Sequence, residues 1–154
     1  MTFKCEIIER EAQHTLSVRT TSAVQNLPEV LGKNYGAIMQ YLGQLNKQMS
    51  GPPFVAYYNM DIQNLEIEIG IPVSNKLSDI DEIKANEIPS GKFASCFYIG
   101  PYNEISPAYE TLTKFIEEKG YEATGIAYEM YLNDPCEVPP EQLQTQILFP
   151  IKKK

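Results

Sequence analysis

The chain has 154 residues, a length that suits a single domain able to bury a sizeable core. Apolar residues make up 43% and charged residues 21% of it, which excludes disordered and fibrous proteins. The formal charge of -7 offers no positive field to a phosphate backbone, so we expect no direct nucleic-acid partner. No apolar run approaches the roughly 18–20 residues of a membrane span, and charges from Lys4 to Glu11 interrupt any secretory leader. We therefore expect a cytoplasmic protein without membrane contact.

Metal, cofactor and disulfide chemistry have little support in the residue inventory. Cys5, Cys96 and Cys136 are odd in number and widely spread, so they predict ordinary thiols and no disulfide framework. His14 is the only histidine, which makes a poor zinc set. The GxSxG, HExxH, GxxxxGK[ST] and GxGxxG spacings are missing from the sequence. We predict no metal site and no cofactor.

In chain order, the first half predicts strands at 3–9 and 14–20, then a helix and a hairpin. Apolar side chains recur at steps of three and four from Leu27 to Met49, which predicts an amphipathic helix that a Gly-Pro-Pro sequence ends. The segments FVAYYNMD (54–61) and LEIEIGIPV (65–73) follow as two strands of a hairpin. Strict alternation in the second segment predicts one apolar face and one face that carries glutamates.

The second half repeats this order. Strands are predicted at 82–88 and 92–99, a helix at about Asn103–Lys119, and two further strands at 127–134 and 144–151. The second helix has the same apolar spacing as the first, which indicates that the chain contains two copies of one supersecondary unit.

We therefore predict a duplicated strand-helix-strand-strand unit within a single domain, 1–154. The copies run from about 3 to 73 and from 83 to 151, joined by the polar linker 74–81, and each copy is expected to have its own leading strand. A helix with one apolar stripe must bury it on a sheet, so the fold class is α+β, with antiparallel sheets and two main helices. A central groove between the copies is the expected ligand site.

A single acid stands out in the aromatic strand GIAYEMYL (125–132). Alternation puts Glu129 on one face with Ala127 and Tyr131. Its carboxylate is either on a wetted face or held inside for a purpose, because an unpaired buried charge costs several kcal/mol. An alignment of the copies at 73 residues matches it with Ala56, so the fold itself does not require the acid.

The same alignment predicts that Phe54, Ala56 and Tyr58 share the face that carries Glu129. Glu66 and Glu68 are predicted to lie on a solvated face, with a weaker possibility that they extend an acidic groove.

Tyrosines are the predicted lining of the ligand site. The chain has ten tyrosines, six phenylalanines and no tryptophan, and one acid bracketed by rings suits an organic cation. Taken alone, each helix tyrosine is more simply explained as core packing. Periodicity makes four tyrosines candidates: Tyr58, Tyr98, Tyr102 and Tyr109.

The segments GKFASCFYIGPY, YEMYLNDP and the closing FPI, with GIPV upstream, resemble the GyrI-like small-molecule-binding family over about residues 3–151. That family is similar to the effector-binding domains of multidrug-responsive bacterial transcription activators. The resemblance implies that Glu129 meets cationic, aromatic ligands inside a groove. It also implies that Tyr35, Phe54 and Tyr131 occupy lining positions.

The resemblance supports three functions. The first is a stand-alone protein that binds a hydrophobic, cationic or aromatic small molecule around Glu129. The second is a hydrolase of cyclopropane-containing or other reactive xenobiotics, in which Glu129 and a tyrosine would be catalytic. The third is an inhibitor of DNA gyrase, with gyrase or a regulatory protein as its partner.

Overall fold

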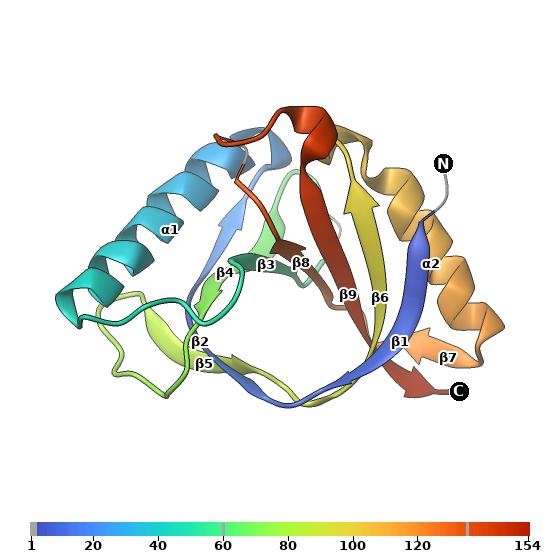
Figure 1. The fold of residues 1–154 in the computed structure, drawn as a ribbon, viewed down its shortest axis with the longest axis horizontal. Helices are drawn as coiled ribbons and strands as arrows, with labels where there is room; N and C mark the ends of the chain where they lie inside the picture. The colour runs from blue at the N-terminus through green and yellow to red at the C-terminus, as the bar shows by residue number, and fades with distance from the viewer. Residues whose placement is uncertain (1–2, 60, 135) are drawn as a thin grey trace. The chain divides into compact units, whose positions relative to one another are not determined.

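The computed structural model describes residues 3–59, 61–134 and 136–154, and within them it contains two α-helices and nine β-strands (Figure 1). Met60, inside the predicted strand 54–61, lies outside the described residues. The elements are, in order, β1 (Lys4–Arg10), β2 (Gln13–Ser22), α1 (Leu27–Gln44), β3 (Phe54–Tyr57), β4 (Leu65–Pro72), β5 (Lys84–Ile88), β6 (Gly91–Ile99), α2 (Ser106–Glu118), β7 (Tyr121–Ala123), β8 (Ala127–Tyr131) and β9 (Gln144–Lys153).

The chain divides into two compact units. One, here called the terminal unit, comprises Met1–Arg10 and Gly91–Lys154, and the other, the internal unit, comprises Glu11–Ser90. Each is an antiparallel sheet with one helix packed on it. This confirms the α+β class and the duplicated unit.

In the terminal unit, β1, β6, β9 and β8 form an antiparallel sheet in that order, and β7 pairs with the end of β9. Helix α2 packs against β6 and β7. Its buried residues Ala108, Leu112 and Ile116 meet a cluster that includes Cys96 and Ile147. This cluster is the core on which the second half of the chain folds.

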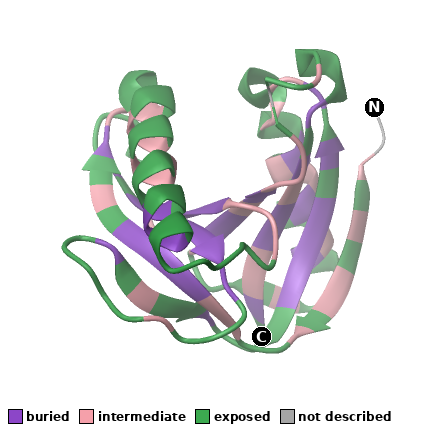
Figure 2. Ribbon diagram, turned by 60° about the vertical axis from the view of Figure 1, so that its left-hand side comes forward, coloured by how far each residue is buried: buried purple, intermediate pink, exposed green. Residues whose placement is uncertain are grey.

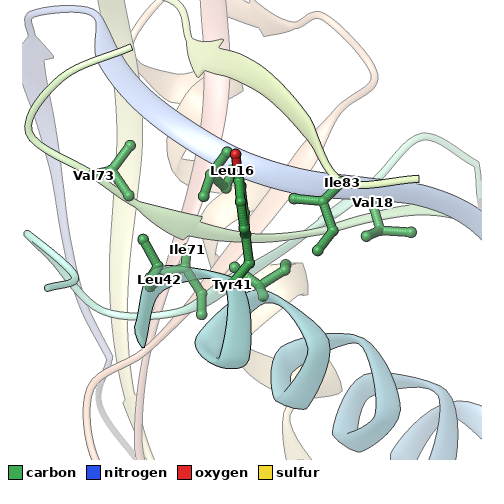
Figure 3. Close-up of a cluster of buried hydrophobic side chains, with 8 residues drawn as sticks. Leu16, Val18, Tyr41, Leu42, Ile71, Val73 and Ile83 are labelled. Carbon is green, nitrogen blue, oxygen red and sulfur yellow. The ribbon is translucent and has the colours of Figure 1, made fainter. Parts of the chain in front are cut away.

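In the internal unit, β3, β4, β2 and β5 form the corresponding antiparallel sheet, and α1 packs against β4 and β2. Helix α1 is exposed over most of its surface, and the side that it buries carries Ile38, Tyr41 and Leu42 (Figure 2). These side chains belong to one buried cluster with Leu16 and Ile71. The close-up shows Tyr41 and Leu42 beside them (Figure 3).

Neither leading strand pairs with the copy that directly follows it in sequence, so this prediction was wrong. Strand β1 pairs with β6 of the terminal unit, and β5 pairs with β2 of the internal unit. The two copies have exchanged their leading strands.

Turn chemistry explains the exchange. Only Glu11 and Ala12 separate β1 from β2, and only Pro89 and Ser90 separate β5 from β6. A two-residue hairpin needs a positive φ at its first central residue, which proline cannot adopt and most other residues avoid. In the described part of the chain, the non-glycine residues with positive φ are Asn46 and Asp81, at neither connection. Strands β1 and β5 therefore do not fold back on the strands that follow them, and they pair with β6 and β2 instead.

Helix α1 ends at Gln44, five residues before the predicted end at Met49. Asn46 adopts the left-handed conformation with φ of 55°, and its N–H donates to Gly43 O. The N–H of Lys47 donates to Leu42 O over 2.9 Å, which completes a Schellman motif. An asparagine takes the place that glycine usually has in this motif, so the sequence signal for the stop was weak.

The remaining boundaries are close to those predicted. Strands β3 and β8 are shorter than expected, and β7 was not predicted. Helix α2 begins at Ser106, after a 3₁₀ turn at Tyr102–Glu104, with proline in its first turn. In the part of the chain that the structure describes, neither helix is long and apolar enough to cross a membrane.

Candidate functional site

Strand register places Glu129 on the side of the terminal sheet that α2 covers. Glu129 lies directly opposite Ile147 in the β8–β9 ladder, and Tyr131 lies opposite Thr145. Opposed residues share a face, and Ile147 belongs to the core cluster beneath α2. The predicted acid and its strand neighbour Tyr131 therefore point toward the helix.

Two phenol hydroxyls hold the Glu129 carboxylate. Tyr109, on the second turn of α2, donates to Oε2, and Tyr131 donates to Oε1 over 3.0 Å. Both carboxylate oxygens thus accept hydrogen bonds from residues that were candidates in the sequence analysis. The helix and the strand together fix the position of the charge.

Burial raises the pKa of Glu129, and the hydrogen bonds from Tyr109 and Tyr131 partly oppose this by favouring the ionised form. The residue is nevertheless only half-buried. A poorly hydrated carboxylate gains more from a nearby cation than a fully hydrated one does. The carboxyl therefore keeps its proton to a higher pH than an ordinary glutamate does.

Aromatic rings extend from this carboxylate on both sides. The ring of Tyr102 lies edge-on to Tyr131 at 5.5 Å, and the ring of Tyr109 lies 5.6 Å from that of Phe149. Tyr102 is 38% exposed, and its pKa is raised by burial and by the negative charges of Asp134 and Glu129. Phe149 was not among the predicted residues, although alternation along 144–151 puts it on the same face as Ile147, where it could have been found.

Tyr98 occupies a different environment. It is 2% exposed, belongs to the core cluster of the terminal unit, and donates to Pro101 O over 2.6 Å. Its ring packs on Phe3 at 6.1 Å. The structure therefore gives Tyr98 a packing position beneath the surface.

The remaining candidates belong to the internal unit. Tyr35 of α1 donates to Phe54 O over 2.6 Å, which ties the helix to the start of β3. Phe54 is 1% exposed, and Tyr58 donates to a Glu68 oxygen over 2.5 Å.

The predicted equivalence of Ala56 and Glu129 is wrong by one residue. Ala56 pairs with Glu68, on the face of the internal sheet turned away from α1, whereas Glu129 lies on the helix-covered face of its own sheet. The residue on the matching face is Val55, which lies opposite Ile69. A one-residue offset exchanges the two faces of a strand, so Phe54 and Ala56 do not lie on the face that corresponds to that of Glu129.

Glu68 is buried, which corrects its predicted place on a solvated face. It is 6% exposed and accepts hydrogen bonds from Ser17 at 2.5 Å, Tyr58 at 2.5 Å and Asn86 at 2.8 Å. These three donors replace water around the carboxylate, which is how a buried acid is tolerated. Glu66 is exposed as predicted and lies 3.9 Å from Arg19.

Among the described residues, there is no group of three or more histidine, cysteine, aspartate or glutamate side chains that could hold a metal ion.

Comparison with protein families gives one match over nearly the whole chain. The model described as a GyrI-like small molecule binding domain matches residues 3–152. A search of curated proteins returned no match.

Solved structures share the fold at low sequence identity. The C-terminal domain of EcmrR aligns with a TM-score of 0.83 at 19% identity, covering 100% of both chains. In a complex with DNA, EcmrR aligns with a TM-score of 0.85, and this chain spans 58% of its length. A protein named as a hydrolase from Listeria innocua aligns at 0.72 with 16% identity, covering 97% of this chain and 92% of the other. SAV2435, solved bound to tetraphenylphosphonium, aligns at 0.70 with 14% identity, covering 97% and 94%.

Proposed function

Because the chain belongs to the GyrI-like small-molecule-binding domain family, we propose that it binds hydrophobic organic cations against the carboxylate of Glu129. The observation that carries this proposal is the state of the Glu129 carboxylate. It is poorly hydrated but still partly exposed, and Tyr109 and Tyr131 each donate a hydrogen bond to one of its oxygens. Because burial leaves this carboxylate poorly hydrated, a nearby positive charge on a ligand would stabilise its ionised form.

The rings around the acid supply the second attraction. A cation over an aromatic face gains about 0.5–2 kcal/mol, more where the site is desolvated. Tyr102 and Tyr131 present rings within 5.5 Å of each other beside the acid, and Tyr102 is the more exposed of the two. A ligand with delocalised charge and aromatic substituents would be attracted both by the Glu129 carboxylate and by the rings. SAV2435, a structural neighbour, is named as bound to such a cation.

The experiment is a calorimetric titration of the full chain with tetraphenylphosphonium. Replacing Glu129 by Gln keeps the size of the side chain and removes its charge, so we expect the affinity to fall by about 1–3 kcal/mol, or 5- to 150-fold. The matched control is Glu66→Gln, which removes an exposed carboxylate and should leave the affinity unchanged. Equal affinities of the wild type and the Glu129 variant would overturn the proposal.

A second series of variants distinguishes the contribution of the tyrosine rings to binding from that of their hydroxyl groups. Tyr131→Phe retains the ring and removes a hydrogen bond to Glu129, whereas Tyr102→Ala removes the exposed ring. We expect Tyr102→Ala to weaken tetraphenylphosphonium binding by about 1 kcal/mol. Tyr35, Phe54 and Tyr58 stay predicted lining residues, and alanine variants in the same titration test them.

A hydrolase is the second candidate, favoured by the hydrogen bond from Tyr109 to an acid whose pKa is raised. Such a carboxyl can hold a proton and give it to a strained ring as a carbon–heteroatom or carbon–carbon bond breaks, while water supplies the nucleophile. The net change is the addition of one water to the substrate. Mass spectrometry of cyclopropane-containing electrophiles incubated with the protein tests this, and product should form with Glu66→Gln but not with Glu129→Gln.

An interaction with DNA gyrase stays a prediction of the family resemblance. A pull-down with purified gyrase tests it directly.

A further inference from the structure

Two cysteines that are far apart in sequence face each other across a strand pair. Cys5 of β1 lies directly opposite Cys96 of β6 in the antiparallel ladder. Both are free thiols on the side of the terminal sheet that α2 covers. Cys96 is fully buried and Cys5 is half-buried, so the Cys5 thiol is partly accessible to a reagent and the Cys96 thiol is not.

We propose that Cys5 and Cys96 form a reversible cross-strand disulfide when the protein meets a small disulfide oxidant such as oxidised glutathione. Opposed residues in an antiparallel pair have their Cβ atoms about 4.5–5.5 Å apart, and a disulfide requires about 3.5–4.5 Å. A small approach of the two strands therefore closes the bond. The strain that this leaves makes the bond easily reduced, as expected of a reversible modification.

The reaction proceeds by two thiol–disulfide exchanges. The Cys5 thiolate attacks one sulfur of oxidised glutathione, which forms a mixed disulfide and releases one glutathione thiolate. Cys96 then gives its proton to a base in solution and attacks the Cys5 sulfur, which releases the second glutathione. Two protein thiols are oxidised, and one glutathione disulfide is reduced to two glutathione molecules.

The environment of Cys96 sets the pace of the second exchange. Burial, together with the neighbouring Cys5, raises the pKa of Cys96 to about 12. Little thiolate is present near neutral pH, so the ring closure is slow and becomes faster as pH rises. Strand β1 is at the end of its sheet and pairs with β6, so local opening of this strand gives the reagents access.

The bond would fix β1, one of the two strands that the copies exchange. Strand β1 is held to the terminal unit through its ladder with β6 and through Ile7 and Cys5 in the core cluster. A covalent link at Cys5 restricts the unfolded chain over a long loop, which stabilises the folded protein. The same cluster contains Tyr109, so the oxidised form is also expected to hold α2 more firmly on its sheet.

The test uses the full chain with Cys136→Ser, which removes the exposed third thiol. The folded protein is incubated with oxidised glutathione at several pH values and analysed by intact mass and peptide mapping. We expect a crosslinked peptide joining Cys5 to Cys96, formed faster at higher pH and lost on treatment with dithiothreitol. The Tm should rise by about 5–10 °C on oxidation.

Two variants complete the test. Cys5→Ser and Cys96→Ala, each made in the Cys136→Ser background, should show no rise in Tm. Peptide mapping that finds only glutathione adducts, or the crosslink only in denaturant, overturns the proposal. Oxidation of the wild-type chain, mapped in the same way, keeps the result independent of how the variants fold.

Discussion

The hydroxyl of Ser17 donates a 2.5 Å hydrogen bond to the carboxylate of Glu68 across the internal sheet. The terminal unit repeats this pair 78 residues later, where Gln146 donates to the hydroxyl of Ser95 over 3.0 Å. The same two positions thus hold a serine with an acid in one copy and a serine with an amide in the other. Both copies thus have a hydrogen bond between these two positions, although the serine donates in one and accepts in the other, and the charge differs.

We expect Glu68→Ala to lower the free energy of unfolding by about 2–4 kcal/mol, because Ser17, Tyr58 and Asn86 lose their shared acceptor. Glu68→Gln introduces the residue that the other copy has, so its cost should be about 1–2 kcal/mol. Urea denaturation of both variants beside Glu66→Gln measures this. Equal stabilities of Glu68→Ala and wild type would show that the network contributes nothing.

The ring of Phe54 packs directly over Gly70. A Cβ added at position 70 would lie 2.5 Å from Phe54 Cζ, so Gly70→Ala must displace a fully buried ring. We expect a loss of about 1–3 kcal/mol in the free energy of unfolding. The control is Gly36→Ala in α1, where an added Cβ meets nothing within 4 Å and should stabilise the helix by about 0.5–1 kcal/mol. Thermal melts of the two variants should shift in opposite directions.

Leu112 is the fully buried anchor of α2 in the terminal core. Leu112→Ala should cost about 2–5 kcal/mol through lost burial and the cavity that remains. Met39→Ala in α1, where the side chain is 44% exposed, should change stability by less than about 0.5 kcal/mol. Chemical denaturation compares the two, and similar costs would contradict the assignment of the core.

Periodicity was sufficient to find both helices and every strand except β7. The apolar steps of α1 and the alternation of β4 follow directly from the geometry of helices and strands, and both elements lie where they were predicted to begin. The exchange of β1 and β5 was not predictable in this way, because it depends on which strand completes each sheet. Its local signal was that Pro89 excludes a tight hairpin before β6.

Only part of the candidate site could be predicted, because local patterns are visible in the sequence and distant contacts are not. Glu129 was conspicuous as a lone acid in an aromatic strand, and the structure brings Tyr109 and Tyr131 to it. Glu68 was missed because alternation with Glu66 made both resemble a wetted face. Its burial depends on donors from three distant positions, and such tertiary partners leave no periodic trace in a sequence.

Burial raises the pKa of Glu129, so the folded protein binds this proton more tightly than the unfolded chain does. The free energy of unfolding contributed by this group therefore falls as pH rises from the ordinary glutamate pKa through the raised one, and is constant above it. One proton allows a slope of at most about 1.4 kcal/mol per pH unit. Glu129→Gln lacks the proton, so its stability relative to wild type should increase across this window.

Urea denaturation of wild type and Glu129→Gln between about pH 4 and pH 9 measures that difference, and subtraction cancels the other titrating groups. The affinity of the wild type for tetraphenylphosphonium should rise across the same window, because the ionised carboxylate attracts the cation, while that of Glu129→Gln stays flat. A stability difference that is constant over the whole range would mean that the Glu129 carboxyl is hydrated in the folded protein as it is in the unfolded chain, and the proposed binding of a cation there would then lose its electrostatic basis.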